Sequence, residues 1–296
     1  MPNNANARYH DTVNAIAQYI YDNVEQPITL ADLADKFSVS KYHLNRIFFA
    51  HTGMNLGEFV QRRRLEFGYS LLATQTMSVV DVAVRVGYDS HAAFSRAFSK
   101  LFEIEPNQVK QHNAPEFALA KLIKQPERKI IQGEILTLPA QKLLGLHGQG
   151  FDQQSYFAVA QQLYQGIADA LSLSDGYDFS QHQLYGISID NPWRVEQSQS
   201  RFFAGIAESS ITNNAKQEQF SLEEYLMPAG LWARFEHKGS YQTMWQTILN
   251  IYASWFSEND YQLRDSAIVQ HYVNDVTTTP ADELITHIYV PLAKSR

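Results

Sequence analysis

The sequence contains no cysteine and no long apolar run. With 0 Cys in 296 residues, disulfides, thiolate zinc sites and cysteine nucleophiles are excluded. No apolar segment approaches the roughly 20 residues that a membrane-spanning helix needs. The first residues, MPNNANARYHDT, are polar and lack the apolar centre of a secretory signal peptide. These absences predict a soluble cytoplasmic protein.

Signatures of several enzyme classes are missing as well. The histidines form no HExxH pair, and no GxSxG elbow is present. The segment 145–150, GLHGQG, has neither the GxGxxG order of a dinucleotide loop nor the Lys-Ser/Thr that follows a phosphate-binding loop. We therefore expect no metal, no cofactor and no catalytic residues.

The net charge of -7 is unevenly distributed. Residues 1–112 contain 11 basic and 11 acidic residues, whereas residues 113–296 contain 13 and 20, so the acidic excess belongs to the second part. Between Lys41 and Arg64 five residues are basic and only Glu58 is acidic. Such a local patch can contact phosphates although the whole chain is acidic. Charged runs on solvated helices are common, so the patch alone does not identify a DNA-binding protein.

Residues 77–110 show the pattern of two short helices joined by a tight turn. Val79, Val82 and Val86 recur at helical spacing, and Gly87 suits the left-handed residue that ends a helix. Ser90 is placed to cap a second helix, because its hydroxyl can accept an unpaired backbone N–H. One face of that helix is apolar and consists of Phe94, Phe98, Leu101 and Phe102. The segment therefore predicts a helix-turn-helix.

The preceding residues predict a second unit of the same kind. Thr29 can cap a helix over 30–36, and Ser40 can cap a helix over 41–52 that Gly53 ends. An earlier helix ends before Pro27, and a long helix over 56–72 leads to the segment described above. Two helix-turn-helix units joined by one long helix are expected.

The run from Ala83 to Pro106 resembles the signature of the AraC/XylS family of transcription regulators. The agreeing positions are Ala83, Gly87, Tyr88, Ser90, Phe94, Ser95, Arg96, Phe98, Phe102 and Pro106. The sequence departs from the family at Glu103, Glu105 and Val109, where Gly, Ser or Thr, and an aromatic residue are usual. The resemblance covers residues 8–112 and implies an all-α DNA-binding domain.

Residues 113–129 interrupt the helical pattern with Pro115 and Pro126, and we expect a linker there. From residue 130 the pattern becomes strand-like, and a repeat appears at an offset of 89 residues: 138–140 recurs as 227–229, and Gly150 recurs as Gly239. Each glycine precedes a helix rich in aromatic residues and then two strand-like runs. The predicted fold is multidomain, an all-α double helix-turn-helix domain followed by an α+β domain of two strand-helix-strand-strand repeats.

The second part, residues 130–293, resembles the GyrI-like effector-binding domain. The resemblance rests on the repeat order and on three closing segments, YVND at 272–275, TTPADEL at 278–284 and IYVPL at 288–292. It implies a small-molecule site, and it implies a bacterial regulator, because this domain often accompanies AraC-type helices.

The resemblance and the helical faces together indicate which residues contact DNA. A recognition helix presents the residues near its N-terminus to base edges in the major groove. The expected base contacts are Lys41, Tyr42, Asn45, Arg46, His91, Ala92, Ser95 and Arg96. Backbone N–H groups at Ser40 and Ser90 would face phosphates. Arg can hold guanine through two hydrogen bonds and Asn can hold adenine, whereas alanine offers none, so the helix after Ser40 is expected to carry most base specificity. The competing interpretation is that these are ordinary solvated faces.

Two facing repeats leave a cleft, which is a common kind of ligand site. The residues expected to line it are Phe157, Trp193, Tyr225, Trp232, Trp245, Gln270 and Tyr272, although most large aromatic side chains are simply core. In many GyrI-like domains a Glu two residues before the tyrosine meets cationic ligands, and this sequence has Gln270 there. An amide cannot pair with a buried cation as a carboxylate does, so the expected effector is not strongly cationic. Glu208 and Glu236 could restore a charge, but the sequence does not place them.

Together these patterns predict a sequence-specific transcription regulator and not an enzyme. The expected partners are double-stranded DNA and a small-molecule effector, with RNA polymerase as a further option and no membrane. Two other functions remain open. The second domain could be a GyrI-like hydrolase, against which Gln270 argues, or a module that binds a protein partner without a ligand.

Overall fold

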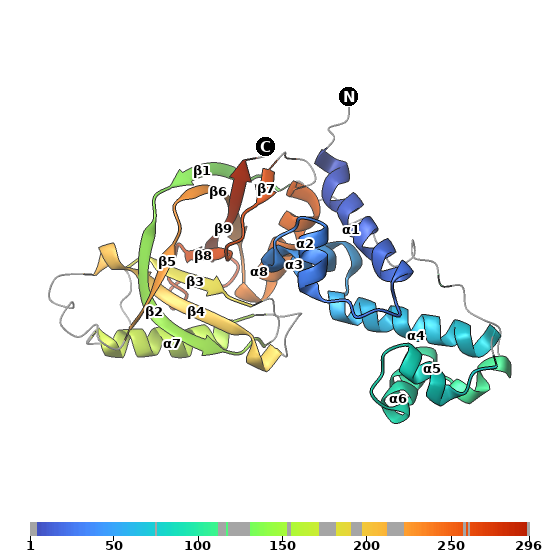
Figure 1. Ribbon diagram of the computed structural model, residues 1–296. Helices are drawn as coiled ribbons and strands as arrows, with labels where there is room; N and C mark the ends of the chain where they lie inside the picture. The colour runs from blue at the N-terminus through green and yellow to red at the C-terminus, as the bar shows by residue number, and fades with distance from the viewer. Residues whose placement is uncertain are drawn as a thin grey trace. The chain divides into compact units, whose positions relative to one another are not determined.

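The computed structural model describes residues 5–74, 76–111, 117, 131–152, 155–171, 182–190, 197–211, 222–256, 259 and 261–294. Two compact units are distinguished, over residues 7–125 and over residues 126–296. Figure 1 shows the first unit as helices alone and the second as a curved sheet with helices. The predicted linker, residues 113–129, lies outside the described residues except for Phe117.

The first unit is built from helices whose ends follow local sequence signals. In chain order they are α1 (Ala5–Asp22), α2 (Leu30–Lys36), α3 (Lys41–Thr52), α4 (Leu56–Thr74), α5 (Val79–Arg85), α6 (His91–Phe102) and the 3-10 helix η1 (Pro106–Gln111). The predicted spans of α2 and α3 are confirmed, and α4 extends two residues beyond the predicted Leu72. Thr29 caps α2 in a capping box, in which its hydroxyl accepts from the Asp32 backbone and the Asp32 carboxylate accepts from the Thr29 backbone.

The turn between α5 and α6 confirms the predicted helix-turn-helix. Gly87 has a φ of 79°, and the N–H groups of Tyr88 and Gly87 donate to the carbonyls of Ala83 and Val84, which is the Schellman arrangement of a helix end. The Ser90 hydroxyl then accepts from the N–H of Ala93 at 3.2 Å and caps α6. Both signals are local, and this is why the sequence reveals them.

The C-terminal end of α6 explains one departure from the AraC/XylS pattern. Glu103, where that family usually has Gly, adopts a left-handed φ of 59°. A side chain in this conformation costs about 1–2 kcal/mol, whereas glycine adopts it freely. The backbone geometry thus accounts for the usual glycine and is retained here at a cost in stability.

An aromatic core holds α4, α5 and α6 together. Phe94 and Phe98 are fully buried, and the Phe98 ring stacks on Tyr69 of α4 at a centroid distance of 5.8 Å. Phe117 belongs to the same cluster, since its ring lies 5.6 Å from that of Tyr69 and 5.8 Å from that of Phe102. Residues beyond η1 therefore contribute to the second helix-turn-helix core.

The second unit is a single antiparallel sheet with helices. Its strands are β1 (Glu134–Leu138), β2 (Gln141–Gln149), β3 (Leu184–Ser188), β4 (Arg201–Ala207), β5 (Glu223–Met227), β6 (Gly230–Lys238), β7 (Tyr261–Leu263), β8 (Val269–Tyr272) and β9 (Ile285–Lys294). They are ordered β1-β6-β9-β8-β3-β4-β2-β5, with β7 paired to β9 outside this path. The all-α and α+β fold classes are both confirmed.

Each repeat begins with a strand that the predicted strand-helix-strand-strand unit lacks, and the second repeat also contains the short strand β7. The extra strands, β1 and β5, come first in their repeats and pair with the second strand of the other repeat, β1 with β6 and β5 with β2. Glu134 faces Arg234 in one pair and Glu223 faces Gly145 in the other, so both pairs keep the offset of 89. Both extra strands lie at the edges of the sheet. In β5 the neighbouring residues Glu223 and Glu224 are both exposed, so its sequence lacks the alternation of apolar and polar residues that usually indicates a strand.

A helix packs on the sheet in the first repeat. α7 (Phe157–Ala170) packs on β2 and β4, as Figure 1 shows. The contact requires glycine at position 148, because a Cβ there would lie 2.7 Å from Cγ2 of Val159 and 3.1 Å from both Cδ atoms of Leu163. The second repeat has α8 (Met244–Asn250) at the corresponding place, continued by a π-helical turn over Ile251–Trp255.

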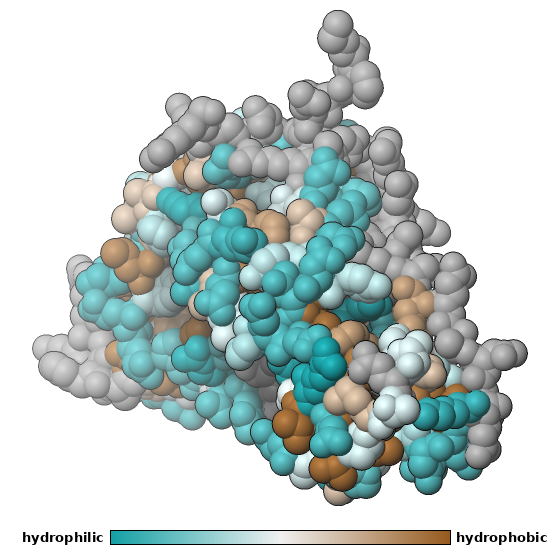
Figure 2. All heavy atoms as spheres, turned by 45° about the vertical axis from the view of Figure 1, so that its right-hand side comes forward, coloured by the Kyte–Doolittle hydropathy of each residue, from teal (hydrophilic) through white to brown (hydrophobic). Residues whose placement is uncertain are grey.

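Large apolar side chains are seldom exposed. On the face drawn in Figure 2 hydrophobic side chains are scattered among hydrophilic ones. Among the described residues the exposed large apolar side chains are Tyr21, Val80, Val84, Phe157, Leu226, Val273 and Val276. Three of these seven, Phe157, Val273 and Val276, line one cavity. No helix within the described ranges is long and apolar enough to cross a membrane.

Candidate functional site

The outer face of α6 collects all four contacts predicted for the second helix-turn-helix. His91, Ala92 and Arg96 are exposed and Ser95 is half-buried, opposite the buried Phe94 and Phe98. The Ser95 hydroxyl lies 3.3 Å from Nε2 of His91. Ser90 caps the helix next to these residues. Their position follows from the helical period, which separates them from the aromatic face, and their contact with DNA stays a prediction.

The candidates on α3 are less accessible. Lys41 is exposed, whereas Asn45 and Arg46 are buried, and the side chain of Tyr42 lies outside the described residues. The Ser40 carbonyl accepts the first helical hydrogen bond, from Leu44 at 2.9 Å. Base reading by Asn45 and Arg46 requires these side chains to become accessible, so their role stays a prediction.

The arginine cluster of α4 serves the packing of the first unit. Arg62 and Arg63 both donate to the buried carboxylate of Glu66, and the Arg63 guanidinium lies 4.4 Å above the ring of Tyr21. A buried carboxylate is stable only when it is paired, so these arginines contribute to the fold. Their positive charge is partly offset by this pairing.

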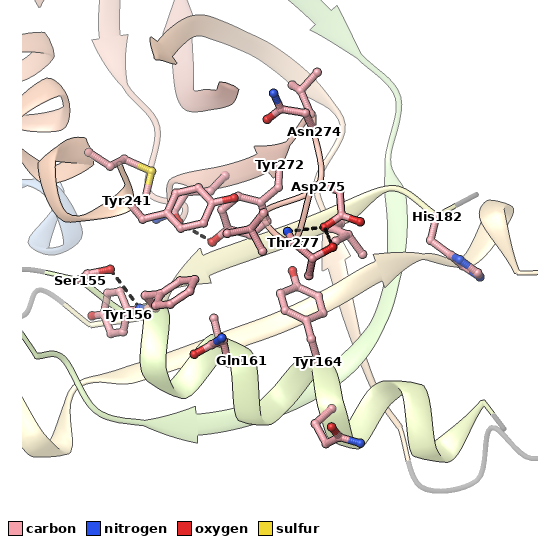
Figure 3. Close-up of a pocket in the computed structure, with 18 residues that line it drawn as sticks. Ser155, Tyr156, Gln161, Tyr164, His182, Tyr241, Tyr272, Asn274, Asp275 and Thr277 are labelled. Carbon is pink, nitrogen blue, oxygen red and sulfur yellow. Dashed lines mark hydrogen bonds between the residues drawn. The ribbon is translucent and has the colours of Figure 1, made fainter. Parts of the chain in front are cut away.

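A cavity of about 350 Å³ opens within the second unit. It lies between α7, the 3-10 turn η7 (Tyr241–Thr243), β8 and residues 273–277, which follow β8. Figure 3 shows the side chains that converge on it. Aromatic rings form much of the wall. The ring centroid of Tyr272 lies 5.2 Å from that of Tyr241 and 6.3 Å from that of Tyr164. The ring centroid of Phe157 lies 5.8 Å from that of Tyr241. The size and the lining are those of a site for a small organic molecule.

The phenols of this wall are neutral at physiological pH. Burial, together with Tyr272 and Tyr241, raises the pKa of Tyr164 well above 10. Burial and Tyr241 raise the pKa of Tyr272 in the same direction. Burial and the charge of Asp275 raise the pKa of Tyr241 to about 12. The tyrosines therefore add no negative charge to the cavity.

Gln270 lies at the buried base of the cavity, and its amide takes part in two hydrogen bonds. The Tyr272 hydroxyl donates to Oε1 of Gln270 at 2.9 Å, and Nε2 of Gln270 donates to the Ser188 hydroxyl at 3.1 Å. Gln270 is fully buried and faces Gly186 on β3. A Cβ at Gly186 would collide with the Tyr272 hydroxyl and would lie 2.6 Å from Cζ of Phe202. The glycine is thus needed for Tyr272 to reach Gln270.

Asp275 places a carboxylate in the cavity wall. Its Oδ1 accepts from the backbone N–H and the hydroxyl of Thr277, both at 2.7 Å. Neighbouring Asn274 ties the loop to β9, because its amide donates to the Glu283 carbonyl and accepts from the Ile285 N–H. The loop that forms this part of the wall is therefore held by hydrogen bonds within itself and to residues 283 and 285.

Three of the seven residues expected to line a ligand site, Phe157, Gln270 and Tyr272, lie together in this cavity. Trp232 and Trp245 are buried in the core and Tyr225 packs on Phe203, so these three lie elsewhere, and Trp193 is outside the described residues. Glu208 pairs with Lys142, and Glu236 is exposed on β6. Neither of these carboxylates lines the cavity.

Sequence reasoning missed Tyr164, Tyr241 and Asp275. They come from α7, η7 and the loop after β8, and only the sheet topology brings these segments together. Only the position of Asp275 within the segment YVND could have drawn attention to it. Among the described residues no group of three or more His, Asp or Glu side chains is arranged to hold a metal ion.

Comparison with known proteins assigns both parts of the chain. A family model described as a GyrI-like small molecule binding domain matches residues 132–293, and one described as a helix-turn-helix domain matches residues 33–112. The transcriptional regulator Rob of Salmonella typhimurium is 23% identical over 279 residues, which cover 90% of this chain and 92% of Rob. The multiple antibiotic resistance protein MarA of Escherichia coli is 28% identical over 102 residues, 34% of this chain and 80% of MarA.

A solved structure described as a hydrolase from Listeria innocua is also similar. It shares 17% sequence identity, covers 57% of this chain and 93% of its own, and gives a TM-score of 0.36. A likeness at this level says nothing about the activity of the present chain.

Proposed function

Since the chain belongs to the AraC-type helix-turn-helix regulators that carry a C-terminal GyrI-like small-molecule-binding domain, we propose that a ligand in its cavity changes how it binds DNA or activates transcription. The observation that carries the proposal is the aromatic cavity of about 350 Å³ in the unit that accompanies the helix-turn-helix domain. The DNA-binding unit supplies the response, and the second unit supplies the sensor.

The exposed face of α6 supports a role in DNA binding. Arg96 can hold guanine through two hydrogen bonds, and His91 and Ser95 can contact bases or phosphates. Ser90 lies at the helix N-terminus, where backbone N–H groups favour phosphate. Ala92 can touch a thymine methyl group but cannot donate a hydrogen bond, so we assign to α6 mainly anchoring and to α3, through Lys41, Tyr42, Asn45 and Arg46, most of the base specificity.

The cavity suits a small aromatic molecule that is not strongly cationic. Gln270 is a neutral amide that is already hydrogen-bonded on both sides, and the tyrosines are neutral. Asp275 is a carboxylate, but Thr277 donates two hydrogen bonds to it. The exposed apolar side chains Val273 and Val276 give the ligand an apolar contact at the same site.

Regulation by this ligand is a shift of an equilibrium. The ligand must bind two states of the chain with different affinity, and DNA affinity must differ between the same two states. The coupling is reciprocal, so DNA would change the affinity for the ligand by the same factor. Contact with RNA polymerase is a further element of this proposal and would decide between activation and repression.

A hydrolytic role is not part of the proposal. The position that would hold a general acid or base carries Gln270, and an amide cannot take up or release a proton in this way. Asp275 is held in a turn by the two hydrogen bonds that Thr277 donates to it.

Fluorescence anisotropy with a labelled duplex, selected from a random pool by the full chain, tests the DNA-binding part. If Arg96 reads a base, Arg96→Ala should weaken binding to the selected duplex by about 1–3 kcal/mol and relax specificity at one base pair. If Arg96 contacts a phosphate, the variant should weaken binding by about the same amount for every duplex sequence. Lys100→Ala, on the same helix, is the matched control for loss of one positive charge. Unchanged affinity of Arg96→Ala at several salt concentrations would remove α6 from the interface.

A thermal-shift screen of small molecules tests the sensing part. All four tryptophans, at positions 193, 232, 245 and 255, belong to the second unit, so tryptophan fluorescence reports its unfolding selectively. A bound ligand raises the midpoint temperature of unfolding. At a ligand concentration of about a hundred times Kd, it adds about 2.7 kcal/mol to the free energy of unfolding. Gln161 lines the cavity from α7, so Gln161→Trp places a bulky ring in its wall. Hits that still bind to this variant would place the ligand elsewhere.

A further inference from the structure

The two helix-turn-helix motifs of the first unit, α2–α3 and α5–α6, are joined mainly through α4. Among the described helices, α1, α2 and α3 have no extensive contact with α5 or α6, whereas α4 packs on helices of both groups. Figure 1 draws α2 and α3 toward the start of α4 and α5 and α6 toward its end. A cavity of about 660 Å³, lined by residues 21–26, by α4 and by Phe117, lies beside α4. Side-chain packing therefore leaves part of this junction open.

An ion pair crosses the junction. Glu25 lies between α1 and α2, and Arg85 is the last residue of α5. The Arg85 guanidinium donates from Nε to one carboxylate oxygen of Glu25 at 3.1 Å and from Nη2 to the other at 3.2 Å. Two such hydrogen bonds fix the direction of a contact as well as its distance. The pair joins residues 60 positions apart and connects the two motifs without passing through α4.

Arg85 is also held from its own side of the junction. Its Nη1 donates to Sδ of Met77 at 3.7 Å, and its guanidinium lies 5.8 Å from the ring centroid of Phe67 on α4. These contacts orient the long side chain toward Glu25. The side chains of Arg85 and Glu25 are 38% and 46% exposed, so the pair adds little to the stability of the fold. Its effect is on the geometry of the junction.

A second arginine lies next to the pair. Nη2 of Arg64, on α4, donates to the carbonyl of Gln26 at 3.4 Å. A Cβ at Gly87 would lie 3.0 Å from Nη1 of the same guanidinium. Arg64 thus lies between the segment that precedes α2 and the turn between α5 and α6. Both arginines hold the segment before α2 close to the second helix-turn-helix.

We propose that the Glu25–Arg85 pair fixes the position of α3 relative to α6, and thereby the spacing of the two DNA segments that the chain binds. Both are positioning residues, because they act through the helices and contact no base. The inference rests on the proposed function, since it requires that α3 and α6 both contact DNA. One inserted base pair moves a segment by about 3.4 Å along the DNA axis and by about 35° around it. To bind such a duplex the two motifs must shift, and the pair must break.

Fluorescence anisotropy with the full chain tests this spacing preference. The selected duplex is compared with duplexes that have one base pair more or one less between the two parts of the motif. The wild type should bind the selected spacing most tightly. In Glu25→Gln and in Arg85→Gln no ion pair has to be broken, so the ratio of affinities should fall by about two- to fivefold, the factor that corresponds to one exposed ion pair.

The two variants separate positioning from direct contact with phosphate. Glu25→Gln removes a negative charge and Arg85→Gln removes a positive one. A direct effect on phosphates would therefore raise the overall affinity in the first variant and lower it in the second. Loss of the pair reduces the spacing preference in both. A reduced preference in Arg85→Gln alone would contradict the proposal.

A cross-linked variant provides the rescue. The chain has no cysteine, so Glu25→Cys combined with Arg85→Cys can be joined selectively by a short bismaleimide. The cross-linked protein should recover the wild-type preference, and the same protein before cross-linking should resemble the single variants. Arg201→Gln is the matched control, because it breaks the two-bond ion pair with Asp190 in the second unit and should leave the preference unchanged.

The outcomes distinguish this inference from the function on which it rests. Equal spacing preferences in the wild type and both single variants, or a cross-link without effect, would overturn the role of the pair and leave DNA binding in place. A wild type that binds no selected duplex would contradict the proposed function itself.

Discussion

Replacing Gly186 by alanine tests how the base of the cavity is built. The added Cβ would collide with the Tyr272 hydroxyl and approach Cζ of Phe202 to 2.6 Å. Phe202 is fully buried on β4, so its ring has no room to withdraw. The tyrosine must then move, and its hydrogen bond to Gln270 is lost or lengthened. The variant combines overpacking with a weakened buried hydrogen bond.

The expected cost follows from these two effects. Overpacking of a tight interior costs about 1–3 kcal/mol, and one neutral hydrogen bond adds about 1 kcal/mol. For a unit of this size each kcal/mol shifts Tm by roughly 2–4 °C, so the tryptophan-monitored transition should fall by several degrees. The affinity for any cavity ligand should fall as well, because Tyr272 forms part of the wall.

Gly166→Ala is the matched control. A Cβ there would lie 2.8 Å from Cδ1 of Leu146, which is the far end of a flexible side chain. Alanine is also favoured over glycine inside a helix by about 1 kcal/mol, so this variant should be neutral or slightly stabilising. A Gly186→Ala protein whose Tm and ligand affinity match those of the wild type would refute the role given to the glycine.

Three other changes have expected outcomes. Glu103→Gly should stabilise α6 by up to about 1 kcal/mol, because glycine adopts the left-handed conformation without strain, and slower amide exchange in α6 would show it. Phe98→Ala should destabilise the second helix-turn-helix by about 3–5 kcal/mol and abolish DNA binding, as measured by denaturation and anisotropy. Burial, aided by His287 and Arg234, lowers the pKa of His271 from 6.5 to about 4. Below pH 6.5 the unfolded chain therefore takes up a proton that the folded chain refuses until about pH 4, so the stability of the second unit should fall across this window. His271→Phe should flatten that fall in urea titrations at each pH, and an unchanged slope would contradict the assignment.

Local signals allowed the sequence to predict the helical part. Thr29, Ser90 and Gly87 act within four residues of their own position, so the caps and the helix end they predict were confirmed. The end of α4 was placed two residues early, because residues 73 and 74 are compatible with a helix and carry no stop signal. Glu103 was recognised as unusual, but its backbone conformation could be seen only in the structure.

The sheet was predictable in its repeats and not in its pairing. The offset of 89 exposed two equivalent halves, whereas the exchange of β1 and β5 between the halves depends on contacts distant in sequence. The strand β5 reads EEYLM and lacks a clear alternation, because it lies at an edge and exposes most of its side chains. A pattern method that relies on a buried face cannot detect such a strand.

The residues that line the cavity were predicted only in part, because they too are brought together by contacts distant in sequence. Phe157, Gln270 and Tyr272 were among the expected residues, but nothing in the sequence separates the cavity-lining aromatic residues from core residues such as Trp232 and Trp245. Tyr164 and Asp275 are 111 positions apart in the sequence. Only the antiparallel pairing of β3 with β8, at the centre of the sheet, brings their segments together.

Selection of duplex DNA from a randomised pool, with and without a ligand found in the thermal-shift screen, tests the central claim most directly. Two helix-turn-helix units in one chain should enrich a motif of two parts about one helical turn, 10–10.5 base pairs, apart. A saturating ligand should change the affinity for that motif, and the motif should change the affinity for the ligand by the same factor. Failure to enrich any motif above the starting pool, or a motif whose affinity is identical with and without bound ligand, would contradict the account.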